Sequence, residues 1–328
     1  MHPPEPILDI AHLGHVELLT PKPEESLRFF TDVMGMTESG RQGDSVYLRG
    51  WDDYERYSLQ LTASKTSGLG HAAFRARSPQ ALERRVAALR ADGAEVTPQE
   101  GELGHGTGWR FRDPDGHVFE IYYDTEWYQA PPDRRTSLKN QAERYPARGV
   151  NVRRIDHFNC LAVDVRACRE FFQRNLGLRC MEHIELDTGE EAGMWLTSNN
   201  KSYDFAFTKE AHGVPGRFHH VTFSLDSREA ILQAADAFLE AGVFIETGPH
   251  KHAVQLVAPE EAGELGVDLA EAGQRILVVG GSQLLPLPYH LLVDLPDPPL
   301  PFPAPQQPGQ AGRANLRPVL LEDREIGR

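Results

Sequence analysis

The chain has 328 residues, of which 40% are hydrophobic and 25% are charged, a composition typical of a globular protein with room for two domains. Its formal net charge of −14 argues against nucleic acid and anionic membranes as partners, because both attract basic surfaces. No apolar run reaches the ~18 residues of a membrane span, and the N-terminal segment does not have the pattern of a signal peptide. The cysteines Cys160, Cys168 and Cys180 predict reduced thiols and a cytoplasmic protein.

The first part of the chain predicts a strand, a helix and three further strands. The strand at 13–18 precedes a helix that starts near Pro23 and carries acidic residues in its first turn and an apolar Phe29–Phe30 pair. Gly35 ends this helix. Three strand-like runs follow, at 36–39, 45–49 and 58–62.

The same order of elements then starts again. A strand at 68–74 leads to a helix at 78–89, in which Ser78 supplies the N-cap and Pro79 the first helical position. A hairpin at 109–122, turned at Asp-Pro-Asp-Gly, completes the second copy.

The second half of the chain repeats the first half at a fixed offset. Three features recur 142 residues later: His15 as His157, the Phe29–Phe30 pair as Phe171–Phe172, and Gly35 as Gly177. An internal repeat of this kind fixes the architecture. We therefore predict an α+β fold of four βαβββ modules in two tandem domains, each an open mixed-sheet barrel.

The predicted domain boundaries follow the composition. Residues 127–149 are polar and charged, so they separate an N-terminal domain at 8–128 from a C-terminal domain at 150–280. A proline-rich stretch then predicts an irregular tail at 281–328, because proline lacks the N–H that helices and central strands need.

Two strand-like runs carry the main functional candidates. Arg-Ile-Asp-His-Phe-Asn contains His157, and Phe-His-His-Val-Thr-Phe contains His219 and His220. Side chains alternate along a strand, so His219 is expected to point away from His220. Two imidazoles from separate strands, together with one carboxylate, form the facial triad that binds non-haem Fe(II) and leaves coordination positions open. These runs therefore predict an iron site.

Taken together, the motifs resemble one known family. Arg-Ile-Asp-His-Phe-Asn, His-His-Val-Thr-Phe and Gly-Pro-His-Lys-His-Ala-Val resemble the C-terminal half of type I extradiol ring-cleavage dioxygenases, which belong to the vicinal-oxygen-chelate superfamily. The first half resembles them through Gly-His-Val-Glu-Leu, Val-Tyr-Leu-Arg-Gly-Trp and Asp-Pro-Asp-Gly-His-Val-Phe-Glu. The resemblance covers residues 8–255.

The resemblance implies a role for five residues. His157 and His220 correspond to the two iron-ligating histidines. Asn159 and Trp195 correspond to residues that line the substrate and oxygen pocket. His252 corresponds to the histidine that positions and deprotonates the bound catechol.

The chain departs from the family pattern at Tyr203. Family members commonly have a histidine there, which hydrogen-bonds the iron-bound oxygen. A phenol can donate a hydrogen bond but is a poor base near neutral pH, so we expect slower proton delivery. We also expect a more electron-rich substrate, such as a trihydroxylated ring.

The second departure concerns the third metal ligand. The family uses a Glu on a strand that follows an aromatic strand, and no such aromatic strand follows Gln255. Matching the strings Val-Asp-Leu and Ala-Gly-Gln-Arg of this chain to the family's pattern assigns the third ligand to Asp268, which is our prediction. Counting from His252 assigns Glu271 instead, and a segment that is foreign to the catalytic fold is the remaining alternative.

The first half contains its own potential triad. His15, His71 and Glu120 occupy the positions equivalent to the three ligands. The resemblance implies a metal-free N-terminal domain, in which these residues are relics. A glyoxalase-like activity that uses this triad is the alternative.

The predicted function is an Fe(II)-dependent extradiol dioxygenase in aromatic-compound catabolism. It would cleave a substituted catechol or trihydroxylated ring beside its vicinal hydroxyls, so its partners would be a small aromatic diol and O2. We also expect a homo-oligomer. Two alternatives stay open. The metal could be manganese in place of iron, or the protein could be a binding module that holds an aromatic molecule without a catalytically competent metal.

Overall fold

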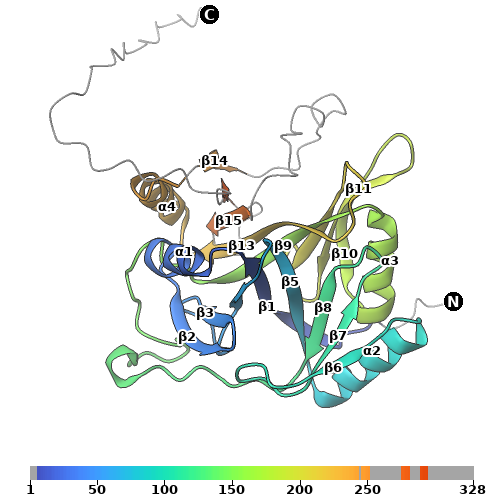
Figure 1. Cartoon of the computed structure of the whole chain (residues 1–328), viewed down its shortest axis with the longest axis horizontal. Coiled ribbons are helices and arrows are strands. Elements are labelled where there is room, and N and C mark those ends of the chain that lie inside the picture. The colour runs from blue at the N-terminus through green and yellow to red at the C-terminus, as the bar shows by residue number, and fades with distance from the viewer. Residues whose placement is uncertain (1–5, 244, 252–274, 281–288, 295–328) are drawn as a thin grey trace, which may run out of the picture. The chain divides into compact units, whose positions relative to one another are not determined.

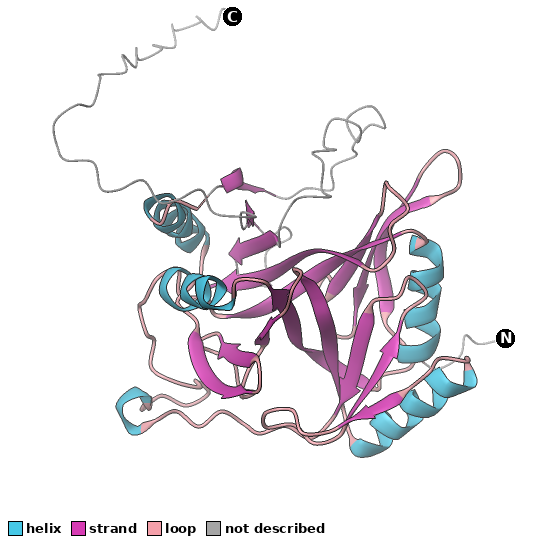
Figure 2. Cartoon of the chain, in the orientation of Figure 1, coloured by secondary structure: helices cyan, strands magenta, loops and turns pink. Residues whose placement is uncertain are grey.

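Two mixed β-sheets, each made from two copies of the predicted module, form the framework of the chain (Figures 1 and 2). The computed structural model describes residues 6–243, 245–251, 275–280 and 289–294. All of these residues belong to one unit, Met1–Asp297.

The first sheet contains β1 to β8. Its first module consists of β1 (Ile10–Thr20), α1 (Pro23–Arg28), the π-helix η1 (Phe29–Val33), β2 (Thr37–Gln42), β3 (Ser45–Arg49) and β4 (Leu59–Ala63). Its second module consists of β5 (Gly68–Ala76), α2 (Pro79–Ala91), β6 (Thr97–Gln99), β7 (Gly108–Arg112) and β8 (Val118–Tyr122). The spatial order β2-β3-β4-β1-β5-β8-β7-β6 places the first strand of each module at the centre, where β1 and β5 pair antiparallel.

The second sheet repeats this plan after a linker that contains the short 3₁₀ helix η2 (Pro132–Arg134). Its first module consists of β9 (Arg154–Ala162), α3 (Val165–Leu176), β10 (Arg179–Glu185), β11 (Glu191–Thr197) and β12 (Phe205–Lys209). Its second module consists of β13 (Arg217–Leu225), α4 (Arg228–Glu240), β14 (Ile245–Lys251), β15 (Arg275–Gly280) and β16 (Tyr289–Asp294). Because β9 and β13 pair antiparallel at the centre, the predicted α+β architecture of four modules is confirmed.

The end of the second sheet differs from the prediction. Its strand order is β13-β15-β16-β14, whereas the first sheet has β5-β8-β7-β6. Pro249 lies within β14, and proline is tolerated there because β14 is the edge strand. The predicted irregular tail contains β16, whose six residues include no proline.

Side-chain caps begin two of the helices, and the cap at Ser78 is the predicted one. The Ser78 hydroxyl accepts a hydrogen bond from the Ala81 N–H at 3.1 Å and caps α2. The Asp164 carboxylate accepts from the Ala167 N–H at 2.9 Å and caps α3, which ends at Gly177 with φ of +70°. Among the described residues no helix is long and apolar enough to cross a membrane.

The predicted first helix is an α-helix that continues as a π-helix. The Met34 N–H donates to the Phe29 carbonyl oxygen at 2.9 Å, an i to i+5 bond. In this region the Phe29 ring stacks on Phe238 of α4, and the Phe30 ring contacts Phe223 of β13, with centroids 6.2 Å apart in each pair. These contacts tie the first module to the fourth.

The two sheets share one hydrophobic core. In β9, Phe158 faces this core, whereas His157 and Asn159 project to the opposite face, as strand alternation requires. The Phe74 ring of β5 lies 6.4 Å from that of Phe158 and 5.6 Å from that of Phe205. Helices α2 and α3 lie side by side (Figure 1). The polar face of each sheet is thereby left for the histidines.

Candidate functional site

The structure brings His157 and His220 together on the polar face of the second sheet. His157 is paired with Thr222 across β9 and β13, and His220 is paired with Asn159. The two imidazole centroids lie 5.6 Å apart, with the ring planes at 76°. Both side chains are buried, with 2% and 9% exposure. Directly paired residues project to the same face, so the predicted histidine pair forms one cluster.

The hydrogen bonds of His157 favour metal binding through Nε2. The Asp156 carboxylate lies 2.7 Å from Nδ1, whereas the hydroxyls of Tyr203 and Thr222 lie 3.2 Å and 3.0 Å from Nε2. Nδ1–H donates to the carboxylate, which leaves the Nε2 lone pair for a ligand bond. Burial lowers the pKa of His157 more than Asp156 raises it, so the neutral form that binds metals prevails.

Tyr203 contacts the same imidazole. Its ring centroid lies 4.4 Å from that of His157. Burial raises the pKa of Tyr203, so its hydroxyl stays protonated and acts as a hydrogen-bond donor. Tyr57 occupies the equivalent position in the first half, with its ring 4.8 Å from His15. A tyrosine beside the first histidine is therefore a feature of both halves.

Asn159 and Trp195 lie in one row across the second sheet. Ala206 of β12 is paired with Asn159 of β9 on one side and with Trp195 of β11 on the other. Paired residues project to the same face, so both side chains project to the face that carries His157. Their predicted role in lining a substrate pocket stays a prediction.

The other predicted site residues, His252 and Asp268, lie outside the described residues, as does the alternative ligand Glu271. Their predicted roles therefore stay predictions.

The register of the described strands identifies one position where the two halves differ. In the first half, Ala73 of β5 is paired with Glu120 of the parallel strand β8. In the second half, the equivalent residue Thr222 of β13 is paired with Leu277 of β15. Leucine has no metal-binding atom, so this register position supplies no carboxylate.

His219 lies beside His220, and the prediction that it points away is wrong. A register shift between Phe218 and His220 interrupts the strand alternation. The Nδ1 atoms of the two histidines lie 2.6 Å apart.

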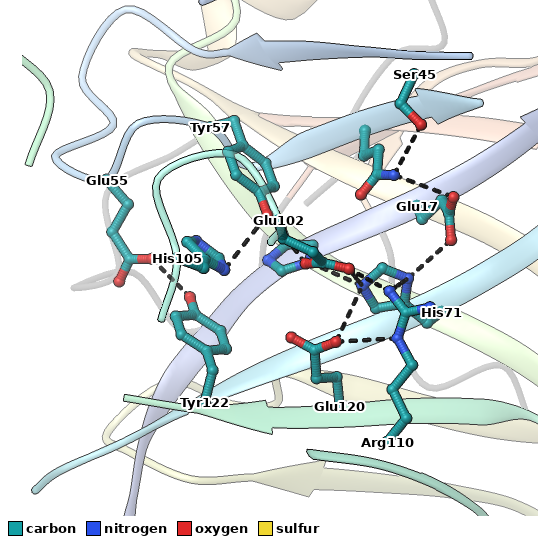
Figure 3. A network of polar contacts seen from close by, with 12 residues as sticks. Glu17, Ser45, Glu55, Tyr57, His71, Glu102, His105, Arg110, Glu120 and Tyr122 are labelled. Atoms are coloured by element: carbon teal, nitrogen blue, oxygen red, sulfur yellow. Dashed lines mark hydrogen bonds and ion pairs between the residues drawn. The ribbon is translucent and has the colours of Figure 1, made fainter. Parts of the chain in front are cut away.

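The first half contains a second histidine pair, His15 and His71, and Figure 3 shows His71 among its polar neighbours. His15 Nε2 and His71 Nε2 lie 2.9 Å apart, and Glu120 Oε2 lies 4.0 Å from His71 Nε2, so the potential triad is assembled. Two further residues, Glu102 and His105, lie close to this pair and come from the β6–β7 loop. Ligand atoms of His15, Glu102, His105 and Glu120 all lie within 4.8 Å of one another. The Glu-x-x-His spacing in this glycine-rich loop was the available sequence signal, and it was missed.

Charged residues surround this first-half cluster. The Glu17 carboxylate accepts a hydrogen bond from His71 Nδ1 at 2.8 Å, and Arg110 Nε donates to Glu120 at 3.0 Å. Burial lowers the pKa of His71, but the bond to Glu17 and the charge of Glu120 outweigh it and raise the pKa overall. Burial holds the pKa of His15 well below its ordinary value, with a further contribution from His71. Burial raises the pKa of Glu120.

The sequence matches one family model twice. The model of the Glyoxalase/Bleomycin resistance protein/Dioxygenase superfamily matches residues 12–121 and 154–258. Metapyrocatechase of Geobacillus stearothermophilus is 40% identical over 250 residues, which are 76% of this chain and 76% of the relative. The manganese-dependent 2,3-dihydroxybiphenyl 1,2-dioxygenase of Geobacillus genomosp. 3 is 36% identical over 281 residues, 84% of this chain and 87% of the relative.

Solved structures agree with these matches. The 2,3-dioxygenase LapB of Pseudomonas sp. KL28 superposes with a TM-score of 0.69 at 25% identity, over 76% of this chain and 86% of that chain. Homoprotocatechuate 2,3-dioxygenase of Brevibacterium fuscum superposes with a TM-score of 0.66 at 28% identity, over 77% of this chain and 76% of that chain. This chain therefore belongs to the Glyoxalase/Bleomycin resistance protein/Dioxygenase superfamily, and within it to the extradiol ring-cleaving dioxygenases.

Proposed function

We propose that this chain uses O2 to open the ring of a small aromatic diol beside its vicinal hydroxyls, at a metal held by His157 and His220. The observation that carries the proposal is the pairing of the two buried imidazoles, with Asp156 holding His157 in the tautomer that ligates through Nε2. Names of the similar proteins mention 2,3-dihydroxybiphenyl and 3,4-dihydroxyphenylacetate, both of which carry neighbouring ring hydroxyls.

Fe(II) is the proposed metal, and Asp268 is the proposed third ligand, with Glu271 as the alternative carboxylate. One relative is named manganese-dependent, so Mn(II) is the alternative metal. Imidazole and carboxylate ligands suit both ions. When bound, the metal supplies a Lewis acid that lowers the pKa of the substrate hydroxyls and a template that brings the diol and O2 together.

The surrounding residues orient the reactants and move protons. Tyr203 donates a hydrogen bond at the site, because its buried phenol stays protonated. His252 is proposed to take a proton from a substrate hydroxyl. Asn159 and Trp195, which lie on the histidine face, are proposed to position the ring. Both oxygen atoms of O2 enter the ring-opened product.

Ring cleavage can be tested directly. Metal-free protein is loaded anaerobically with Fe(II) or with Mn(II), then mixed with catechols and trihydroxylated rings while O2 uptake and the yellow product are recorded. H157A is expected to lower the activity by at least about 100-fold, since it removes a ligand. H183A is the matched control, because His183 lies in the same half with a side chain that is 48% exposed. Absence of O2 uptake by wild-type protein with either metal contradicts the proposal.

In the second half, Leu277 occupies the register position that Glu120 occupies in the first half. This difference favours a second candidate function, a module that binds an aromatic molecule and has no catalytically competent metal in the second half. That candidate predicts saturable catechol binding, no O2 uptake and a metal content that H157A does not change. The dioxygenase predicts a metal content that H157A lowers by one equivalent.

A further inference from the structure

Lys201 lies between the strand that carries His157 and the loop that carries Tyr203. Its ammonium donates a hydrogen bond to the backbone carbonyl oxygen of Asp156 and lies 4.0 Å from Oδ1 of the same residue. On its other side it lies 3.3 Å from Oδ1 of Asp204. The side chain of Lys201 is only 18% exposed, so most of it is shielded from solvent. Lys201 therefore joins β9 to the loop between β11 and β12.

The loop between β11 and β12 is held by Asp204. The Asp204 side chain is 1% exposed, and its Oδ2 accepts hydrogen bonds from the Ser198 N–H at 2.7 Å and the Ser198 hydroxyl at 2.8 Å. Asn199 Nδ2 donates to Oδ1 at 3.1 Å, and the Asn199 side-chain oxygen accepts from the Lys201 N–H at 2.7 Å. Because Tyr203 directly precedes Asp204, this network fixes the backbone from which the phenol extends.

The Asp156 carboxylate faces both Lys201 and His157. Oδ2 lies 2.7 Å from Nδ1 of His157, and the Asp156 side chain is 26% exposed, so water competes for it. A cation that binds the Asp156 carbonyl oxygen and approaches Oδ1 restricts the rotation of this side chain and keeps Oδ2 on the histidine. A carboxylate on the outer nitrogen fixes the tautomer and the orientation of a ligating histidine. Lys201 can thus act on His157 through Asp156.

The first half has no counterpart of Asp156. His15 and His157 are equivalent in the repeat, so Gly14 is equivalent to Asp156. A Cβ at Gly14 would overlap the Tyr122 hydroxyl, so a side chain does not fit there. Within the described part of the chain, Nδ1 of His15 has no hydrogen-bond partner. The first half therefore does not orient its histidine through a preceding carboxylate.

Lys201 is also replaced in the first half. Tyr57 and Tyr203 are equivalent, so Glu55 is equivalent to Lys201, two residues earlier in each case. The Glu55 carboxylate accepts a hydrogen bond from the Tyr122 hydroxyl at 2.5 Å (Figure 3). Both halves share one framework, so a lysine–aspartate pair that is found in only one of them is expected to serve the site of that half.

We propose that Lys201 is a positioning residue for the site in the second half. It holds the Asp156 carboxylate on Nδ1 of His157, and it ties the strand of this histidine to the loop of Tyr203. The inference rests on the proposed function, because it explains the orientation of His157 toward a metal. It also predicts a property of the metal-free protein, namely that Nδ1 of His157 carries the proton and Nε2 does not.

The tautomer of His157 can be measured without metal or substrate. In metal-free protein with isotope-labelled histidine, the nitrogen NMR signals of this residue are assigned by their loss in H157A. Wild-type protein is expected to show a protonated Nδ1, whereas K201M is expected to show a mixture of the two tautomers. K201R keeps a cation beside Asp156 and should retain the wild-type signals.

Lys209 provides the matched control. Its ammonium also contacts a backbone carbonyl oxygen and a carboxylate, those of Val163 at 2.7 Å and Glu190 at 2.5 Å, at the other end of β12. K209M therefore removes a similar pair of contacts from the same module. It should leave the His157 signals unchanged.

Metal affinity is the second readout. In anaerobic competition for Fe(II), K201M is expected to weaken binding by about three- to tenfold, which is less than the loss of a direct partner of the histidine causes. In the D156A background K201M should cause no further loss, since the carboxylate through which Lys201 acts is absent. A lysine that served only the stability of the fold would cause the same loss in both backgrounds.

Two results overturn the proposal. One is that His157 has the same tautomer populations in folded K201M as in wild-type protein. The other is that K201M and D156A weaken Fe(II) binding additively. K201Q, which removes the charge with a smaller change in polarity, takes the place of K201M in both experiments if K201M does not fold. If wild-type protein binds no Fe(II), the proposed function fails, and the tautomer comparison alone decides on Lys201.

Discussion

Asp156 offers a quantitative test of the metal centre proposed for the second half. Its carboxylate lies 2.7 Å from Nδ1 of His157, with side-chain exposures of 26% for the aspartate and 2% for the histidine. A charge-assisted hydrogen bond contributes ~1.5–3 kcal/mol, and the partial exposure of the carboxylate favours the lower part of this range. D156A should therefore weaken metal binding by about 10–30-fold, since ~1.4 kcal/mol corresponds to a factor of ten.

D156N provides a graded comparison. The asparagine oxygen still accepts a hydrogen bond from Nδ1 but carries no charge, so we expect a loss of only about three- to tenfold. Lys201, which lies 4.0 Å from Asp156, keeps its partner Asp204 at 3.3 Å in both variants. The substitution therefore leaves no unpaired lysine beside the site.

The assay is anaerobic competition for Fe(II) with a coloured chelator. Wild-type protein is the parent of both Asp156 variants. D187N, in the exposed turn at Asp187, is the control and should bind like its parent. The reasoning is refuted if folded D156A binds Fe(II) within about twofold of the parent, because Asp156 would then not orient the ligating histidine.

Three further outcomes are expected. Y203F should lower kcat/KM for ring cleavage about fivefold in an O2-uptake assay with metal binding unchanged, because one hydrogen bond of ~1 kcal/mol is lost; equal activity would remove Tyr203 from the mechanism. D268A should sharply lower the iron content measured by elemental analysis while E271A retains it, and the reverse result would transfer the ligand role to Glu271. Arg169 lowers the pKa of Glu191 below its ordinary value of 4.5, so this ion pair stabilises the fold above that value and loses its contribution as the pH falls through the lowered pKa. E191Q should therefore flatten the decline of Tm in acid, and a decline as steep as that of the wild type would contradict this linkage.

Much of the fold could be predicted because its signals are local. Ser78 caps α2 where the sequence places it, and alternation along β9 assigns His157 to the polar face. The repeat also identifies the equivalent positions of His15 and His157. These signals need only neighbouring residues or a count along the chain.

The features that escaped prediction depend on backbone irregularity or on distant contacts. The β-bulge before His220 overrides the alternation expected for His219. Glu102 and His105 lie in the loop between β6 and β7, which do not pair with β1, and only the tertiary fold brings them near His15. Loop side chains follow no periodicity, so a sequence pattern gives no measure of their distance from a strand histidine.

The two halves share one framework but differ in charge at one position beside the histidine pair. Both keep a tyrosine beside a histidine pair, but Glu17, opposite His71, is replaced by Asn159, opposite His220. In the first half, the Glu17 carboxylate accepts a hydrogen bond from His71 Nδ1 at 2.8 Å and adds a buried negative charge. Asparagine avoids an extra buried charge, which would oppose the approach of an electron-rich diol that must lose protons on binding. The single exchange therefore leaves less negative charge beside His220 than beside His71, which suits the diol-binding site proposed for the second half.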